Sequence, residues 1–185
     1  SPQVRQPSWR RSFLAPSMGR GDTQHSYPLQ ILAEVLGGGA TSRLHRTLVM
    51  NGELAVSAST YYDPGAIDLT TFSISASPRI GVAVAKVEAA VEKVVAELLE
   101  KGVTDEEVAN AKRRLQDSAI LARDSFNAGA RTIGAALAMG RTIDDVESWP
   151  DRLGAVTPQQ VLEAAKHVFK ENQSVTGILL PKPTS

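Results

Sequence analysis

The spacing of apolar residues changes in the middle of the chain, and this change limits the fold class more than any other feature. Residues 54–62 and 67–77 have strand patterns and are joined through Asp63-Pro64-Gly65, residue types that favour a tight turn. From Val84 onward, apolar residues recur every three or four positions, as in a helix with one apolar stripe. A hairpin followed by helices predicts an α+β fold, with helices packed on one face of a mainly antiparallel sheet.

Further elements are expected on both sides of this hairpin. Residues 4–14 and 175–180 have the patterns of a first and a last strand. Thr104 with Glu107, and Thr157 with Gln160, have the spacing of capping boxes and mark two helix starts. We expect helices at residues 26–36, from 41 or 42 past 48, at 84–101, from 104 onward, and at 128–139, 144–153 and 158–169.

Charge and cysteine content exclude several classes of function. The chain has 20 basic and 20 acidic side chains, so it lacks the field with which nucleic-acid-binding proteins attract their partner. It has no cysteine, which excludes disulfides, thiolate zinc sites and cysteine nucleophiles and fits both periplasm and cytoplasm. No segment approaches the roughly 20 apolar residues of a membrane helix. We therefore expect neither nucleic acid nor a membrane as partner.

The length of the chain suits one core. With 185 residues it can bury enough surface to fold without disulfide or metal support. It begins Ser1-Pro2-Gln3, without an initiator methionine or a targeting pattern. We therefore expect residues 1–185 to form a single α+β domain that is a fragment of a longer chain.

The second strand of the hairpin alternates between two kinds of side chain. Phe72, Ile74 and Ala76 are expected to pack under the helices. The residues between them carry small hydroxyl groups: Thr71, Ser73, Ser75 and Ser77. This second set forms either a solvated outer face or the lining of a wide cavity that offers hydrogen bonds without bulk.

Residue patterns for catalysis are missing. The three histidines, His25, His45 and His167, belong to neither of the spacings that place two imidazoles and a carboxylate on one helix for zinc. Glu163 and His167 share a helix face, but a zinc site needs at least three protein ligands, so a surface contact is favoured. A Gly-x-Ser-x-Gly nucleophile motif is also missing. We expect no catalytic and no metal-binding residue in this chain.

A glycine-rich loop is the most unusual local feature. Three glycines, 37–39, follow a predicted helix and precede another, whereas phosphate-binding loops follow a strand and contain a lysine. A helix stop needs only one glycine, so we expect close backbone approach by a peptide or a neighbouring domain. Arg43 opposes the dipole of its helix, which predicts a carboxylate from outside the chain or across a domain boundary. The alternative is a flexible surface turn with a solvated arginine. The candidate contact residues are Gly37, Gly38, Gly39 and Arg43.

The same loop carries a resemblance to a known family. Residues 36–44, Leu-Gly-Gly-Gly-Ala-Thr-Ser-Arg-Leu, followed by Leu54-Ala55, resemble the LGGG-x-x-SRL…LA segment of pitrilysin/insulinase-type zinc peptidases. Other matches in the same order are Phe13-Leu-Ala-Pro16, Gly102-Val-Thr104 with Glu107 and Ala111-Lys112, and Trp149 before Val156-Thr157 with Val161. The chain is similar to the C-terminal, non-zinc-binding half of a bacterial member.

This resemblance implies a fold and a division of labour. Members consist of two similar halves that face each other across a chamber, and one half binds zinc through His-x-x-Glu-His and a distant glutamate. The other half closes the chamber around an extended peptide. The chain would be this second half-unit of the processing-peptidase-like metallohydrolase fold, with no cofactor of its own and zinc in a partner. The implied partners are a zinc-bearing N-terminal half or a homologous subunit, a peptide substrate, and a second copy in a homodimer.

The chain departs from the family pattern at two positions. Many active members have an arginine and, seven residues later, a tyrosine that assist substrate binding; the corresponding residues here are Val49 and Val56. Tyr62 has the strand parity of Val56 but lies about 20 Å further along. Another element supplies these contacts, or the subclass works without them, or the parent protein is a scaffold subunit without proteolytic activity. A His-x-x-Glu-His motif about two hundred residues upstream would separate a peptidase from a scaffold. A stand-alone small-molecule enzyme has no polar constellation to support it.

Overall fold

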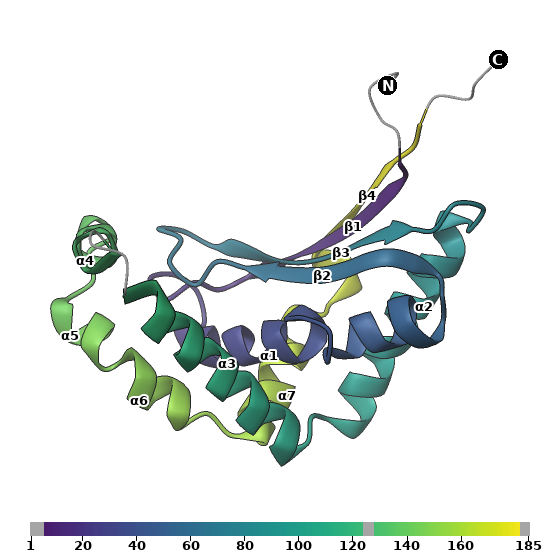
Figure 1. Cartoon of the computed structure of the whole chain (residues 1–185). Helices are drawn as coiled ribbons and strands as arrows, with labels where there is room; N and C mark the ends of the chain where they lie inside the picture. The colour runs from purple at the N-terminus through teal and green to yellow at the C-terminus, as the bar shows by residue number, and fades with distance from the viewer. Residues whose placement is uncertain (1–5, 124–127, 182–185) are drawn as a thin grey trace.

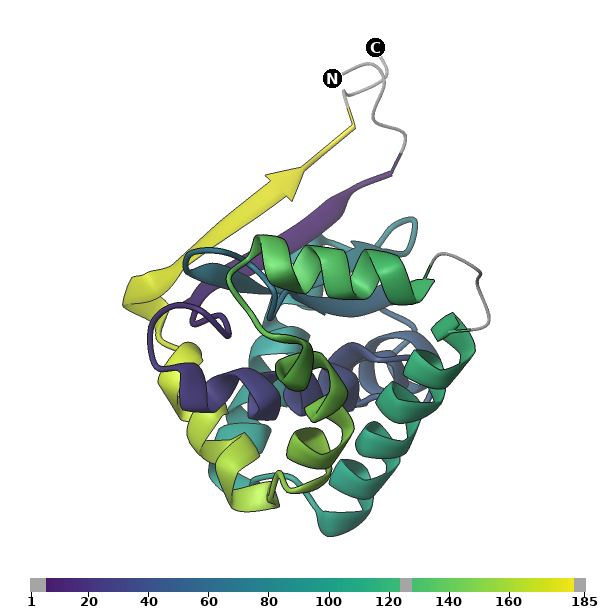
Figure 2. The same ribbon diagram turned by 90° about the vertical axis from the view of Figure 1, so that its left-hand side faces the viewer.

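The expected hairpin forms the centre of an antiparallel sheet. The computed structural model describes residues 6–123 and 128–181. In this part of the chain, one sheet contains β1 (Ser8–Ala15), β2 (Ala55–Tyr62), β3 (Thr70–Pro78) and β4 (Ser174–Leu179), in the order β2-β3-β1-β4. All pairings are antiparallel, and the first and last strands lie side by side (Figures 1 and 2). The expected start of the first strand, Val4, lies outside the described residues.

Helices cover one face of this sheet. Figure 1 shows α1, α2, α3, α6 and α7 beneath the strands, whereas α4 stands beyond one end of the sheet. The helices are α1 (Ser26–Gly37), α2 (Val84–Lys101), α3 (Asp105–Arg123), α4 (Ala128–Ala138), α5 (Ile143–Glu147), α6 (Trp149–Gly154) and α7 (Pro158–Val168). A wide helical turn, η2 (His45–Asn51), and two short turns, η1 (Thr23–His25) and η3 (Glu171–Gln173), connect them. The α+β fold class is confirmed.

The structure has two helices where the sequence predicts one. Residues 144–153 were expected to form a single helix, but α5 ends before Ser148 and α6 begins at Trp149. Pro150 lies at the start of α6, where its missing N–H costs nothing, whereas inside a longer helix it would remove a hydrogen bond and collide with a carbonyl. The single helix was therefore the wrong prediction.

Side-chain caps define the helix starts. Thr104 and Glu107 bond reciprocally at 2.9 and 3.2 Å, and Thr157 forms the same box with Gln160, so both predicted capping boxes are confirmed. A third box joins Thr142 to Asp145. Asp144 and Asp145 lie in the first turn of α5, where carboxylates also interact favourably with the helix dipole.

The core lies between the sheet and the helices. Phe13 of β1 and Phe72 of β3 each meet the ring of Phe169 edge-on, with centroids 5.0 and 5.4 Å apart. The apolar stripe of α2 is buried against them and contains Val87, Val91, Val94 and Leu98. One continuous cluster of buried residues thus joins the two ends of the chain. Within residues 6–123 and 128–181, no helix has the length and apolarity to cross a bilayer.

Candidate functional site

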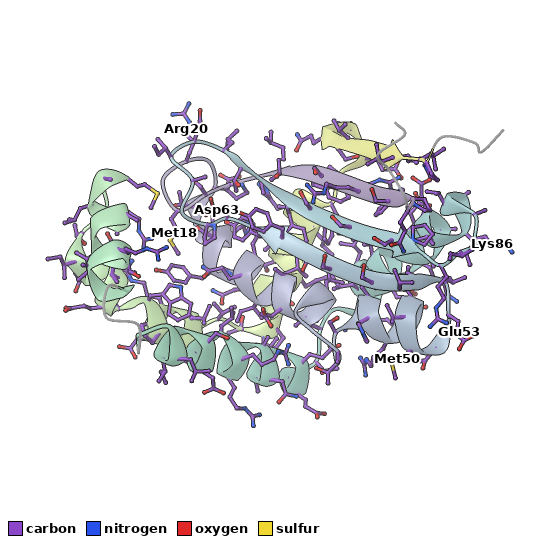
Figure 3. The ribbon with its side chains drawn as sticks, turned by 45° about the horizontal axis from the view of Figure 1, so that its top comes forward. Met18, Arg20, Met50, Glu53, Asp63 and Lys86 are labelled. Carbon is purple, nitrogen blue, oxygen red and sulfur yellow. The ribbon has the colours of Figure 1, made fainter. Side chains whose placement is uncertain are left out.

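The face of the sheet turned away from the helices is the candidate site. In β3, Phe72, Ile74 and Ala76 are buried under the helices, which confirms the predicted alternation. The hydroxyl residues between them belong to the other face, which Figure 1 shows without a covering helix and Figure 3 turns toward the reader. This surface is called the open face here. Small polar side chains occupy its middle strands, and exposed larger side chains lie at its borders: Leu14, Tyr61, Val175 and Leu179.

The register of the strands places hydroxyl groups in rows across the open face. Ser59 of β2 and Arg10 of β1 both lie opposite Ser75 of β3. In the next row toward the middle of the sheet, Ser73 lies opposite both Ser12 and Tyr61, and the Ser12 and Ser73 hydroxyls are 2.8 Å apart. Cross-strand neighbours on one face lie about 5 Å apart, so these groups are adjacent, although Ser73 itself is buried.

A hollow of about 280 Å³ lies on this surface toward the end of the sheet where β1 and β2 begin and β3 ends. Its polar lining comes from three strands and comprises Ser8, Arg10, Ser57, Ser59, Ser75 and Ser77. The hydroxyls can each donate and accept a hydrogen bond, and the guanidinium can only donate. Such a lining suits a polar backbone or an anionic group better than an apolar ligand.

The contributions of β1 and β2 to this hollow were not predicted. The alternation within β3 indicated its hydroxyl set, but Arg10, Ser57 and Ser59 were not among the candidate residues. The alternation of Trp9, Arg11 and Phe13 toward the core would have indicated that Arg10 faces the other way. The alignment of three strands at one level, however, depends on register, which the pattern of a single strand does not contain.

The two valines at the family's arginine and tyrosine positions have different surroundings. Val49 packs against the core, whereas Val56 is 51% exposed at an irregularity in the pairing of β2 with β3. Tyr62 faces the helices and donates a 2.7 Å hydrogen bond to the carbonyl of Pro16; burial raises the pKa of its phenol. Its neighbour Tyr61 is 64% exposed and lies on the open face. The tyrosine available to a ligand is thus Tyr61.

Each glycine of the predicted contact loop has a structural reason within the chain. A side chain at Gly37 would overlap the backbone nitrogen of Thr60 in β2, and one at Gly38 would overlap Glu34. Gly39 has a φ of +129°, which side-chain-bearing residues rarely adopt. Close backbone approach therefore occurs, but between α1 and β2. Contact of this loop with a peptide or a partner stays a prediction.

Arg43 is paired inside the chain. Its Nε and Nη2 donate to the two carboxylate oxygens of Glu107, each at 2.7 Å, and Nη2 also donates to the carbonyl of Gly102. Burial alone would raise the pKa of Glu107, but hydrogen bonds from Arg43 and Thr104 outweigh it and hold the pKa below its usual value. The expectation of a carboxylate from outside the chain is therefore wrong, because the first turn of α3 supplies it.

A second hollow, of about 290 Å³, lies beside this loop. Gly38, Glu34 and Tyr61 are among its lining residues, together with Gln30, Ala33, Thr60, Tyr62, Pro64 and Leu115. The nearby turn between β2 and β3 is held against the loop after β1, since the amide of Met18 donates to the carbonyl of Pro64 at 2.8 Å. Figure 3 shows the labelled Met18 and Asp63 together at this end of the sheet.

The histidines do not form a metal site. His25 and His167 stack with ring centroids 4.6 Å apart, and Nε2 of His167 lies 3.4 Å from the carboxylate of Asp22. Within the described ranges, no three histidine, aspartate or glutamate side chains are grouped so as to hold a metal ion. The residues present therefore do not fit a bound zinc ion, and no catalytic step through zinc is assigned to this chain.

Comparison with protein families identifies one match. The model of a family described as the peptidase M16 inactive domain matches residues 2–115. An uncharacterized zinc protease of Streptomyces coelicolor is 30% identical over 175 residues, which are 92% of this chain and 37% of that protein. The chain thus spans little more than a third of the length of this relative.

Solved structures share the fold. A protease from Helicobacter pylori superposes with a TM-score of 0.85 at 18% identity, covering 96% of this chain and 42% of that one. An inactive peptidase domain from Bordetella parapertussis superposes with a TM-score of 0.84 at 17% identity, covering 96% and 93%. Identities this low carry the arrangement of helices and strands, not the identity of ligands.

Proposed function

The chain belongs to the M16 peptidase inactive-domain family, and from this membership we propose that it closes the substrate chamber of a zinc endopeptidase and helps to bind an extended peptide there. A zinc-bearing half, in the same polypeptide or in another subunit, performs the hydrolysis. Residues 1–185 then constitute one domain, the C-terminal inactive-type half of a longer chain. The zinc ion belongs to the partner half, where it supplies the activated water.

The observation that carries this proposal is the open face. All helices packed on the sheet lie on its other side, so a surface of hydroxyls from three strands remains free to line a chamber (Figure 1). An extended peptide offers one N–H and one C=O per residue, and serine hydroxyls satisfy both without the bulk that would fill the chamber. Of the two interpretations of the β3 hydroxyls, the cavity lining is therefore the one we propose.

Reconstitution tests this division of labour. The isolated chain is expected to hydrolyse no peptide, because it has neither a zinc site in its described part nor a nucleophile motif. Hydrolysis is expected when the zinc-bearing half is added and should disappear with a chelator. Cleavage by the isolated chain that survives both chelator and repurification would exclude the proposal.

A bulky residue on the open face tests the chamber directly. Ser59→Trp places an indole at the hollow and should lower peptide turnover of the reconstituted protein at least tenfold, since the peptide path is narrowed. The matched control is Ser118→Trp, the same change at an exposed position of α3 in the helical layer. Equal turnover in both variants, with equal melting temperatures, would remove the open face from the substrate path.

The predicted contact loop remains part of the proposal. We propose that Gly37–Gly39 and Arg43 lie at the border between the halves, and the hollow beside Gly38 supports this placement. Because Gly38→Ala would collide with Glu34, the better probe is Thr41→Trp, which places a bulky side chain at an exposed position between Gly39 and Arg43. Weaker peptide binding or weaker association of the halves is expected; no change in either would make the loop purely structural.

A scaffold subunit without proteolytic activity is the second candidate. Val49 and Val56 favour it, because valine can neither donate a hydrogen bond nor stabilise an oxyanion. If the parent gene encodes no His-x-x-Glu-His motif and no zinc-bearing partner restores turnover, the scaffold function replaces the peptidase function.

A further inference from the structure

The four strands have an unusual charge pattern. Across β1, β2, β3 and β4 there is no aspartate and no glutamate, and the only cations are Arg10 and Arg11. Arg11 faces the helices, where Nη2 and Nη1 donate to Glu88 and Glu92 of α2 at 2.6 and 2.9 Å. Arg10 faces the other way. The strand residues therefore give the open face one positive charge and no negative one.

Arg10 is held in place but not neutralised. Its Nε donates to the Ser75 hydroxyl at 3.0 Å, which orients the guanidinium. Among the contacts of the described residues, no carboxylate pairs with Arg10, whereas Arg11 has two such partners and Arg43 and Arg114 have one each. The two terminal nitrogens of Arg10 thus retain their donors for an external acceptor.

The surroundings of Arg10 favour an anion of small size. On one side Gly177 of β4 lies opposite it and has no side chain that could cover the guanidinium. On the other side are Ser75 and then Ser59, whose hydroxyls can donate to the same acceptor. A guanidinium fork flanked by hydroxyl donors matches the planar geometry and hydrogen-bonding capacity of a carboxylate.

We propose that the hollow around Arg10 binds a carboxylate group of the extended peptide. The inference rests on the proposed peptide-binding function and adds a substrate class to it: peptides that carry an acidic group at the segment opposite this domain. The group has two possible sources, the side chain of an aspartate or glutamate and the C-terminal carboxylate of the peptide. Both present the same two oxygens to Arg10.

Three peptides separate these sources. Each peptide has ten residues, which are alanine, serine and glutamine apart from the central position. A neutral fluorophore is attached at the N-terminus. One carries a central glutamate and a C-terminal amide, the second a central glutamine and a free C-terminus, and the third is neutral at both places. Binding to the chain is measured by fluorescence anisotropy at pH 7.5 in low salt. At least one acidic peptide should bind about five- to tenfold more tightly than the neutral one, and salt should reduce this preference.

Variants assign the preference to the hollow. Arg10→Gln should abolish it, and Arg10→Lys should retain part of it, because the charge remains but the fork is lost. Arg113→Gln is the matched control, since Arg113 is exposed on α3 in the helical layer and its loss removes the same charge. Melting temperatures of all variants should be equal, because Arg10 and Arg113 are both exposed.

The outcomes distinguish this inference from the function on which it rests. Equal binding of all three peptides would overturn the carboxylate site and leave peptide binding intact. A preference that persists in Arg10→Gln would place the acidic group elsewhere and would also overturn it. If none of the peptides binds, peptide binding by this domain and the carboxylate site both fail.

Discussion

Arg10 and Arg11 are adjacent on β1 and have opposite environments. Side chains alternate along a strand, so one lies on the open face and the other under α2. Only 18% of the Arg11 side chain is exposed. A guanidinium buried to this extent needs partners of opposite charge, and Arg11 has two, the carboxylates of Glu88 and Glu92. Arg43 follows the same rule, because its half-buried guanidinium is matched by Glu107. At the residue scale, burial separates structural arginines from one that can bind a ligand.

Glu107 provides a stability test at this scale. Glu107→Gln removes the capping carboxylate of α3 and leaves Arg43 without its partner, so the free energy of unfolding should fall by about 1–2 kcal/mol at pH 7, allowing for solvent screening. Urea unfolding followed by circular dichroism measures the loss. Glu106→Gln, the same change at the exposed neighbour, should alter stability by less than about 0.5 kcal/mol.

The same pair predicts a pH dependence. The pKa of Glu107 is lower in the folded chain than its ordinary value of 4.5, so the folded state binds the proton less readily than the unfolded state. The contribution of ionised Glu107 to the stability of the fold is therefore fully present above about pH 4.5. It is lost as the pH falls through the pKa that Glu107 has in the folded chain. The stability difference between wild type and Glu107→Gln should shrink over that range. A constant difference would contradict the assigned ion pair.

The end of α1 lies directly against β2, and this contact fixes where the helical layer meets the sheet. Gly37 permits it, because the backbone of Thr60 occupies the space of a side chain, and the Thr60 hydroxyl donates to the carbonyl of Ala33 at 2.7 Å. At the scale of elements, the glycine loop allows the end of a helix to pack closely against an edge strand.

Gly37→Ala tests this packing. The added methyl group must displace β2 or α1, so the free energy of unfolding should fall by about 1–3 kcal/mol in chemical denaturation. Gly134→Ala in α4 is the control, since a methyl group there meets no neighbour among the described residues and should leave stability unchanged or raise it by about 0.5–1 kcal/mol. Similar effects of the two changes would show that helix propensity, not the contact with β2, decides the outcome.

The stacked histidines join the start of α1 to the end of α7. Burial and the neighbouring His167 lower the pKa of His25 from its ordinary value of 6.5, although Asp22 and Glu163 oppose this effect. Because the pKa is lowered, the contribution of neutral His25 to stability is fully present above about pH 6.5. It is lost as the pH falls through the pKa that His25 has in the folded chain. The melting temperature should therefore drop between pH 7.5 and pH 5.5, and it should drop less in His25→Gln. An unchanged pH profile in that variant would exclude His25 as the cause.

The whole molecule has one covered face and one open face. Because every helix that packs on the sheet lies on the same side, the opposite surface is available to a second domain or a peptide (Figure 1). This arrangement is shared with solved inactive peptidase domains. In the proposed peptidase, this domain contributes surface and positioning, and another half carries the metal chemistry.

Metal analysis tests this division at the molecular scale. Purified chain, after dialysis without chelator, should contain well under one zinc ion per molecule, because a tetrahedral site needs at least three protein ligands and the described residues do not group them. Atomic absorption measures the content. A tightly held equivalent of zinc that disappears on mutation of His167 would contradict the expectation, and a control mutation at His45 should leave the zinc content unchanged.

Local pattern by itself determined the α+β class, the hairpin, the two long helices and the capping boxes at Thr104 and Thr157, because each depends on residues close together in the chain. It also separated the buried and hydroxyl-bearing sets of β3. Only the tertiary structure decided that Glu107 pairs with Arg43, that β2 requires a glycine at position 37, and that a hollow forms around Arg10. Each of these three features depends on residues more than twenty positions apart in the chain. Such contacts depend on strand register and on how a helix end meets a sheet, and those are properties of the assembled chain that the periodicity of one segment does not encode.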